Sequence, residues 1–176
     1  VPTHAEAKDI LAGAMLNFAR QEVEAGPVQA PDGGKNDRPS IAILGEMFPA
    51  DPMVLGAMIE PLGLATGPVL PAREWRELYA ALDCQVVAAI HPFYKATLRE
   101  FDAAGRQAVG SAPVGYDGTA NWLSSIGEAF GVPSKQVAKA QNMFLPSIRE
   151  ALKNNPINGK ITLSGYEGSE LLVARL

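Results

Sequence analysis

Short apolar runs alternate with segments of helical periodicity along most of this sequence, and this alternation constrains the fold more than any other feature. Each run has the length of a strand and is followed by residues that favour the start of a helix. The predicted strands are residues 41–44, 64–70, 86–90, 108–111 and 161–164. Strands and helices in alternation predict an α/β fold, a three-layer Rossmann-like parallel sheet with helices on both faces.

Proline marks several of the predicted helix starts. Because proline lacks a backbone N–H, it costs no hydrogen bond in the first turn of a helix. The helices that follow the strands are expected to start at Asp51-Pro52, at Pro71, at Pro92, near Thr119 and near Ser169. A further long helix, residues 134–153, is predicted before the last strand.

The beginning of the chain differs from the alternating region. We predict that residues 1–38 form a helix and a linker, and that residues 39–176 form the Rossmann-like α/β domain. Thr3 to Glu6 have the form of a capping box, and residues 26–39 contain three proline and three glycine residues without periodicity. The helix between them is predicted from apolar residues at helical spacing, namely Ile10, Leu11, Ala14, Met15 and Phe18.

Composition and charge narrow the possible functions. The 176 residues carry 15 Lys and Arg against 19 Asp and Glu, and no basic stripe is available to bind nucleic acid. No apolar stretch approaches the roughly 20 residues that a membrane-spanning helix needs, and no secretory signal opens the sequence. The absence of an initiator Met and the uncapped helical pattern at the end predict a piece of a longer cytoplasmic protein, inactive by itself.

Cys84 is the only cysteine in the sequence, so the chain cannot form an internal disulfide. An iron–sulfur cluster or a structural zinc ion needs three or four ligands, which one cysteine does not supply. Because Cys84 precedes the strand at residues 86–90, we expect it at the sheet end opposite the ligand-binding edge, as a small buried apolar residue. We therefore predict no metal ligand in this chain.

Four segments directly follow predicted strands and should meet at the edge where parallel α/β sheets bind ligands. They are residues 45–49, 91–94, 112–119 and 165–168. Glycine allows close backbone approach and aromatic side chains offer flat apolar area, which together suit a large planar ligand. Alternatively, the glycines only form tight turns. The candidate substrate-binding residues are Met47, Phe48, Phe93, Tyr116, Gly165 and Tyr166.

Three titratable residues at this edge are candidate catalytic groups: His91, Glu46 and Glu167. His91 is expected at a strand end and helix start, where the helix dipole favours a neutral imidazole that donates a proton, acts as a ligand or simply caps the helix. Glu46 and Glu167 could relay protons, although acids near helix N-termini are also favoured without any catalytic role. Asp117 and Thr119 are alternatives for the N-cap of the next helix.

The order and the amino-acid sequences of these segments resemble those of the nitrogenase component 1 family. The shared pattern is Leu-Gly-Glu after the first strand, His91 after the third, a Pro-x-Gly-x-x-x-Thr loop at residues 113–119 and Ser-Gly-Tyr-Glu-Gly at residues 164–168. Longer stretches, spread over essentially the whole chain, resemble its tetrapyrrole-reducing members: Val-Pro-Thr-His-Ala-Glu-Ala-Lys, Gly-Glu-Met-Phe-Pro-Ala-Asp-Pro, Ser-Ala-Pro-Val-Gly-Tyr-Asp-Gly-Thr-Ala and Leu-Ser-Gly-Tyr-Glu-Gly-Ser-Glu-Leu-Leu.

This resemblance implies the function of the complete protein. It implies an oxidoreductase subunit that pairs with a homologous second subunit in a heterotetramer, with a [4Fe-4S] cluster between them and a tetrapyrrole as substrate. An ATP-dependent reductase protein with its own iron–sulfur cluster would supply the electrons. In the family, the cluster cysteines lie in a region that precedes this one, and the segments around His91, Glu46 and Tyr166-Glu167 approach the substrate cavity.

Two other interpretations of the sequence stay open. One is a non-catalytic α/β ligand-binding module, which tight binding of a small polar solute by the isolated chain would favour. The other is a different nitrogenase-like tetrapyrrole reductase that acts on another ring of the pigment. Assays of the complete subunits with both pigments separate the two reductases.

Overall fold

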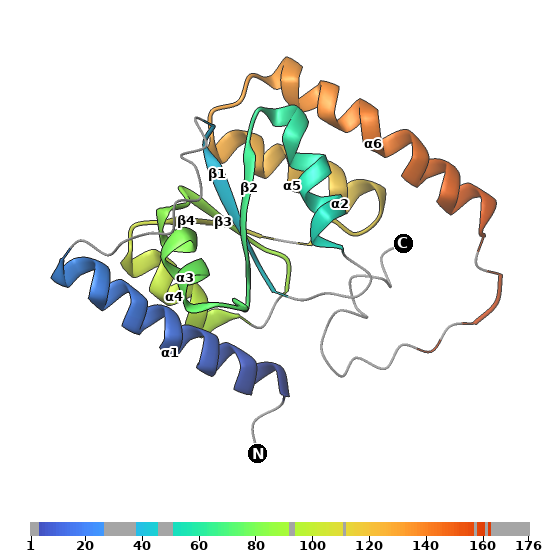
Figure 1. Cartoon of the computed structure of the whole chain (residues 1–176). Helices are drawn as coiled ribbons and strands as arrows, with labels where there is room; N and C mark the ends of the chain where they lie inside the picture. Colours follow the sequence, from blue (N-terminus) through green and yellow to red (C-terminus); the bar gives the residue numbers. More distant parts are fainter. Residues whose placement is uncertain are drawn as a thin grey trace.

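The computed structural model describes residues 4–26, 38–45, 51–91, 94–110, 112–156, 158–160 and 162, and Figure 1 shows their arrangement. The described strands form one sheet in the order β2-β1-β3-β4, and all neighbours are parallel. The strands are β1 (Ser40–Leu44), β2 (Ala65–Leu70), β3 (Val86–Ala89) and β4 (Gln107–Val109). The predicted parallel sheet is confirmed, and these strands lie close to the predicted positions.

Helices cover both faces of the sheet: Figure 1 shows α1, α3 and α4 on one side and α2, α5 and α6 on the other. The helices are α1 (His4–Ala25), α2 (Pro52–Ile59), the short 3-10 helix η1 (Glu60–Leu62), α3 (Trp75–Asp83), α4 (Lys95–Ala103), α5 (Gly115–Ala129) and α6 (Ser134–Asn154). Side chains of β1 alternate between the faces, with Ile41 and Ile43 in one core cluster and Ala42 and Leu44 in the other. A core on each face confirms the three-layer architecture.

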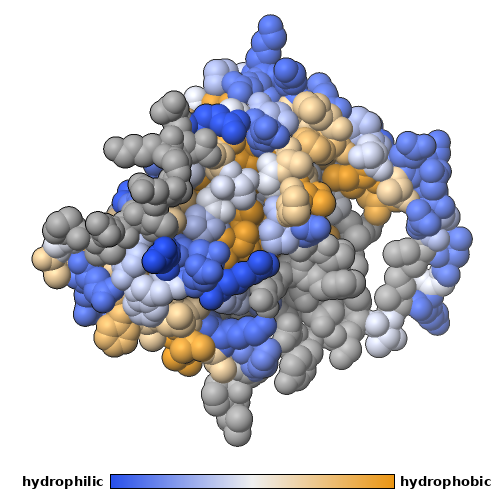
Figure 2. Space-filling model, viewed as in Figure 1, coloured by the Kyte–Doolittle hydropathy of each residue, from blue (hydrophilic) through white to orange (hydrophobic). Residues whose placement is uncertain are grey.

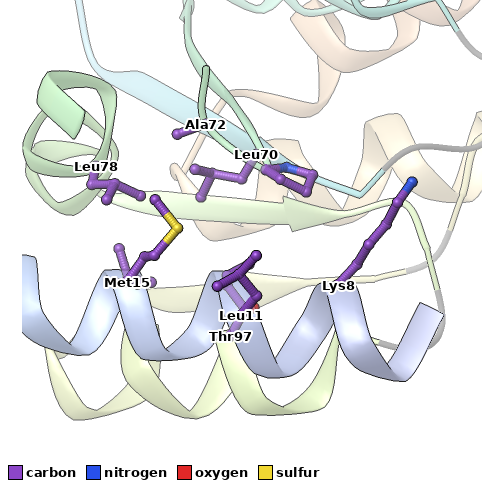
Figure 3. A pocket seen from close by; sticks show the side chains of 10 residues that line it. Lys8, Leu11, Met15, Leu70, Ala72, Leu78 and Thr97 are labelled. Carbon is purple, nitrogen blue, oxygen red and sulfur yellow. The ribbon is translucent and has the colours of Figure 1, made fainter. Parts of the chain in front are cut away.

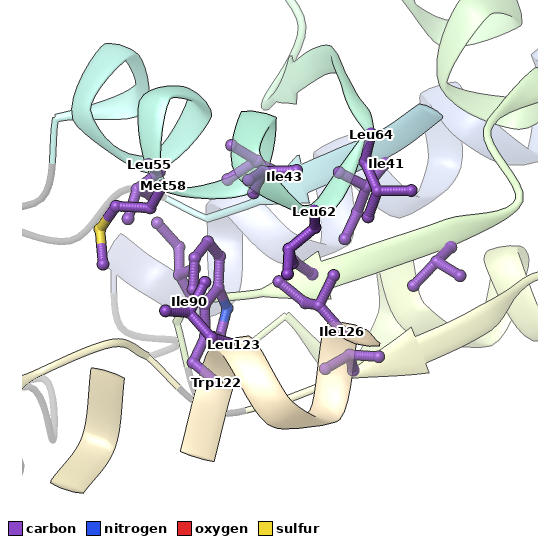
Figure 4. Packing of buried hydrophobic residues seen from close by; sticks show 14 of the residues in the cluster. Ile41, Ile43, Leu55, Met58, Leu62, Leu64, Ile90, Trp122, Leu123 and Ile126 are labelled. Atoms are coloured by element: carbon purple, nitrogen blue, oxygen red, sulfur yellow. The ribbon is translucent and has the colours of Figure 1, made fainter. Parts of the chain in front are cut away.

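The core between the sheet and α5 consists of apolar side chains (Figure 4). Trp122, Leu123 and Ile126 of α5 are at most 1% exposed. They belong to one cluster with Leu55 and Met58 of α2 and with the facing residues of the sheet. Burying a side chain of this size contributes about 1.5–3 kcal/mol. Apolar burial is thus the main stabilising contribution on this face.

On the opposite face, polar contacts supplement the apolar core. Leu16 of α1 and Phe101 of α4 are fully buried in the second cluster. Near the end of both helices, Asn17 donates a hydrogen bond to Glu100 at 2.8 Å, and the Arg20 guanidinium pairs with the same carboxylate at 3.2 Å. These polar contacts attach α1 to α4 near the end of both helices.

The outer side of α1 also carries apolar residues. Ile10, Leu11 and Phe18 are each more than 60% exposed, and Figure 2 shows apolar side chains at the surface along this helix. The spacing that predicted the helix therefore picked out mostly exposed residues, with Met15 half-buried, whereas the buried row is Ala12, Leu16 and Ala19. In the structure α1 packs on the α/β unit, and a division of the chain between residues 38 and 39 stays a prediction.

Of the two helices α2 and α3, both predicted to start at a proline, only α2 does so. The start of α2 is confirmed, because the Asp51 side chain accepts a hydrogen bond from the first turn, as an N-cap should. In contrast, α3 begins at Trp75 and not at Pro71. Glu74 and Glu77 form a reciprocal capping box there, and this satisfies the first N–H groups of the helix at Trp75.

The expectation that His91 stands at a helix start is wrong. The following helix, α4, begins at Lys95 and not at Pro92, and Tyr94 is its N-cap residue. The carboxylate of Asp9, from α1, accepts hydrogen bonds from the first turn of α4 and so fixes where that helix begins. The helix dipole acts on its own first turn, so the predicted effect of the dipole on the His91 imidazole loses its basis.

The start of α5 also differs from the prediction. It begins at Gly115 with Val114 as N-cap, so neither Asp117 nor Thr119 caps it. Thr119 is instead 1% exposed within the helix, where its side chain is part of the packed interior. The long helix predicted for residues 134–153 is confirmed as α6.

The last predicted strand, residues 161–164, and the helix expected near Ser169 lie outside the described residues, apart from Thr162. Thr162 is not part of a strand. Among the helices that the structure describes, none is long and apolar enough to cross a membrane.

Candidate functional site

The carboxyl edge of the sheet contains the point where the chain connections diverge. From β1 the chain passes to β2 on one side and then crosses to β3 and β4 on the other. The Ile90 N–H donates to the Leu44 carbonyl at 2.9 Å, and the Gly45 N–H donates to the Leu70 carbonyl at 2.8 Å, so these strand ends are aligned. Open parallel sheets bind ligands at such switch points. The topology therefore identifies the residues that follow β1 and β3 as the candidate site.

Gly45, directly after β1, lies against His91, directly beyond β3, and this contact requires a glycine. Its φ is +112°, a conformation that side-chain-bearing residues rarely adopt. A β-carbon on Gly45 would lie 2.5 Å from the β-carbon of His91 and 3.0 Å from its backbone nitrogen. Since backbone atoms cannot rotate away, only glycine lets the two segments approach so closely. Glu46 follows Gly45 directly in the sequence.

The His91 side chain is held by its neighbours. His91 is 6% exposed, and its ring meets the ring of Tyr94 edge to face, with 5.5 Å between the centroids and an interplanar angle of 90°. Tyr94 is itself only 2% exposed. Such contacts favour one orientation of both rings. An imidazole held at the ligand-binding edge of a sheet can transfer a proton or hydrogen-bond a substrate.

Of the predicted site residues, the structure describes His91 and Tyr116. The candidates Glu46, Met47, Phe48, Phe93, Gly165, Tyr166 and Glu167 lie outside the described residues. The structure brings His91 together with Gly45 and Tyr94, which belong to two of the predicted edge segments but were not named as individual site residues. The sequence did contain a signal for Gly45, because it directly follows a predicted strand. In the structure that strand, β1, lies next to β3.

Tyr116, the remaining candidate, lies in the first turn of α5 and lines a separate hollow of about 460 Å³ between α5 and α6. The guanidinium of Arg149 lies over the Tyr116 ring, 4.3 Å from its centroid. This is the geometry of a cation–π contact, which ties the start of α5 to α6. Asn142, Leu145, Pro146, Glu150, Lys153 and Asn154 complete the lining of the hollow.

A smaller, mostly apolar cavity of about 190 Å³ lies at the carboxyl end of β2, between α1 and α3 (Figure 3). Leu70 and Pro71, at the end of the strand, are among its lining residues, and Lys8 stands at one side. The remaining lining residues are Leu11, Ala12, Met15, Leu16, Ala72, Leu78 and Thr97. The sequence did not predict this cavity, because it depends on how α1 lies across the sheet.

Cys84 is located as predicted, near the amino ends of the strands and 2% exposed. Its sulfur lies 3.5 Å from the Ser40 hydroxyl, which donates to it, and 3.4 Å from the Ala80 carbonyl oxygen. Burial raises the pKa of the Cys84 thiol, and the Ser40 hydrogen bond opposes that rise. A buried thiol at the end away from the ligand edge is a poor candidate for metal binding.

A metal site needs several ligand side chains close together. Within the part of the chain that the structure describes, no three His, Cys, Asp or Glu side chains lie close enough together to hold a metal ion. Cys84 lies in the core at the other end of the sheet, so the described residues contain no group that could hold an iron–sulfur cluster by itself.

Comparison with known proteins gives one matching family. The model of the nitrogenase component 1 type oxidoreductases matches residues 1–176. Chlorophyllide reductase 52.5 kDa chains from Cereibacter sphaeroides and Rhodobacter capsulatus are 71% and 68% identical over all 176 residues. A light-independent protochlorophyllide reductase subunit N from Bradyrhizobium sp. is 29% identical over 110 residues, 62% of this chain and 26% of that protein. The chain spans 35% of the length of the two more similar relatives.

Proposed function

From the premise that this chain belongs to the nitrogenase component 1 type oxidoreductases, we propose that it forms part of the Y subunit of chlorophyllide a reductase. The observation that carries this proposal is the similarity to two chlorophyllide reductase chains, which are 71% and 68% identical over all 176 residues. The similarity to the protochlorophyllide reductase subunit is only 29% over 110 residues. Identity of this size favours a shared substrate over a shared fold alone.

The proposed reaction reduces a ring B double bond of chlorophyllide a during bacteriochlorophyll synthesis in the cytoplasm. Two electrons and two protons add across one carbon–carbon bond, so the product carries one hydrogen more on each carbon. The electrons would come from the ATP-dependent X reductase protein and pass through a [4Fe-4S] cluster between the Y and Z subunits. The cluster supplies the electron transfer, and the protein must position the pigment and deliver protons.

Within this scheme, the described residues contribute at the carboxyl edge of the sheet. We propose that His91 holds or transfers a proton at its imidazole, because it is positioned at the switch point by Gly45 and Tyr94. Glu46 and Glu167 remain candidate proton donors from neighbouring segments. Met47, Phe48, Phe93, Tyr116, Gly165 and Tyr166 remain the proposed pigment contacts.

The test uses the full-length Y and Z subunits with the X protein. Activity should be seen with chlorophyllide a and not with protochlorophyllide, and the reverse preference would overturn the proposed substrate. His91→Gln keeps the size and polarity of the side chain but cannot transfer a proton, so we expect kcat to fall about 10²-fold or more. The matched control is His4→Gln, because His4 is the other histidine and is exposed at the start of α1. Unchanged turnover and pigment affinity in His91→Gln would show that His91 has no such role.

A further inference from the structure

A carboxylate of α1 completes the first turn of α4, the helix that follows His91. Asp9 Oδ2 accepts a hydrogen bond from the Ala96 N–H at 2.7 Å, and Asp9 Oδ1 accepts one from the Thr97 N–H at 2.9 Å. The Thr97 hydroxyl lies 2.9 Å from Asp9 Oδ1 and 3.3 Å from the Asp9 carbonyl oxygen. Asp9 is 6% exposed, so its carboxylate is almost fully removed from water.

The first turn of α4 needs this external partner. The first N–H groups of a helix have no acceptor within the helix, and a side chain of the N-cap residue usually supplies one. The N-cap of α4 is Tyr94, whose side chain makes no capping hydrogen bond. Asp9 takes over this task from 87 positions away in the sequence, and its negative charge also suits the positive end of the helix dipole.

The capped turn leads directly to His91. The Tyr94 carbonyl accepts the first hydrogen bond of α4, from Leu98 N–H at 3.0 Å, so the Tyr94 backbone is fixed together with this turn. The Tyr94 ring in turn contacts the ring of His91 edge to face. On its other side, His91 lies against Gly45. Any shift of the first turn of α4 therefore reaches the imidazole through Tyr94.

We propose that Asp9 is a positioning residue for His91: it fixes the start of α4, and through Tyr94 the orientation of the imidazole at the sheet edge. This inference rests on the proposed function. Burying a carboxylate is costly unless it is fully hydrogen-bonded, and the Asp9 carboxylate accepts three hydrogen bonds from the first turn of α4. The second polar link between the same helices, from Arg20 to Glu100, is more exposed and lies toward the far end of α4.

The test compares Asp9→Asn with Glu100→Gln in the full-length subunit, assembled with its partner proteins. An Asn side chain has one acceptor oxygen, and its NH₂ group would face an N–H donor, so Asp9→Asn weakens the cap without changing the volume. Glu100→Gln weakens the other link between α1 and α4 in the same way, far from His91. The readouts are amide hydrogen exchange at Ala96 and Thr97, kcat and KM for chlorophyllide a, and thermal stability.

We expect faster exchange at these two amides and a kcat about fivefold to tenfold lower in Asp9→Asn, with neither change in Glu100→Gln. Thr97→Val, which replaces the hydroxyl by a methyl group and keeps the backbone N–H, should change both readouts in the same direction but by a smaller amount. In the His91→Gln background, Asp9→Asn should lower kcat no further, because its effect passes through His91. An additive loss there, or an equal loss in Glu100→Gln, would overturn the inference.

The two proposals fail in different ways. If His91→Gln keeps full turnover, the proposed role of His91 is wrong, whatever Asp9 does. If His91→Gln is impaired but Asp9→Asn has wild-type exchange and wild-type kcat, the role of His91 stands and only the positioning role of Asp9 is wrong. Should Asp9→Asn not fold, unchanged exchange and kcat in Thr97→Val would decide against the inference.

Discussion

Each end of the sheet has a glycine whose backbone lies against a titratable residue, His91 at one end and Cys84 at the other. The two ends differ in the surroundings of that residue. At the carboxyl end Gly45 lies against His91, where the strand connections diverge. Near the amino end Gly67 of β2 lies against Cys84, and a β-carbon on Gly67 would be 2.5 Å from the sulfur. The thiol has its polar contacts inside the core, whereas the imidazole belongs to the edge where such folds bind ligands.

The comparison shows that close approach to a glycine does not by itself indicate a functional residue. Gly67 makes room for an apolar-like thiol and so allows the core to close. Gly45 makes room for an imidazole at a topological switch point. The position in the sheet, rather than the contact, makes His91 the candidate site residue and leaves Cys84 a packing residue.

Gly45→Ala should have the largest effect on stability. Its backbone lies in a region that is strained for other residues, at about 1–2 kcal/mol, and the contact with His91 should cost about 1–3 kcal/mol more. We expect urea unfolding to show a total loss of about 2–5 kcal/mol. Gly105→Ala is the matched control, because its φ is also positive, at +71°, but no atom lies within 4 Å. If both variants lose the same stability, the ends of β1 and β3 can separate without cost.

Gly67→Ala should have a smaller effect, because the backbone of Gly67 is not strained. The added carbon would meet the Cys84 sulfur at 2.5 Å and the Ile41 carbonyl oxygen at 3.1 Å. Overpacking of this kind costs about 1–3 kcal/mol, again measured by urea unfolding. Cys84→Ala removes the sulfur, so the double variant should lose clearly less than the sum of the single variants. Simple additivity would mean that Ile41, and not Cys84, limits the space.

Local patterns in the sequence were enough to predict the sheet and its ligand-binding edge. Alternation of apolar runs and helices gave the described strands, and the position of His91 after β3 followed from them. Proline predicted the start of α2 but not of α3, because the reciprocal bonds of Glu74 and Glu77 outweighed the preference of Pro71. For α3, the capping box of two residues therefore indicates the first residue of the helix better than the single proline does.

Contacts between distant parts of the chain could not be predicted in this way. The carboxylate of Asp9 caps a helix 87 positions later, and nothing near Asp9 in the sequence indicates that partner. Likewise, the apolar residues of α1 occur on more than one side of the helix, and only packing against α3 and α4 decides that Leu16 is buried and Leu11 exposed. The cavity at the end of β2 depends on the same packing.

Ser40→Ala should have the smallest effect and tests what sets the pKa of the buried thiol near the amino end. Burial raises the pKa of Cys84 and the Ser40 hydroxyl opposes that rise, so removing the hydroxyl should raise the pKa further. A raised pKa means that the folded state holds its proton more tightly than the unfolded state. The resulting contribution to stability is present below the ordinary thiol pKa and is lost as the pH rises through the folded value.

The titration of an isotope-labelled Cys84 β-carbon, followed by its chemical shift, measures this pKa directly, since Cys84 is the only cysteine. The hydrogen bond is long, at 3.5 Å, so its loss should change the unfolding free energy at neutral pH by less than about 1 kcal/mol. Ser147→Ala, which removes a hydroxyl on α6 that bonds only the Phe144 carbonyl in the described contacts, should leave the titration unchanged. A fall in the pKa of Cys84 in Ser40→Ala would mean that solvent reaches the sulfur once the hydroxyl is gone. The thiol would then be shielded from water by the Ser40 hydroxyl and not by the close packing of Gly67 against Cys84.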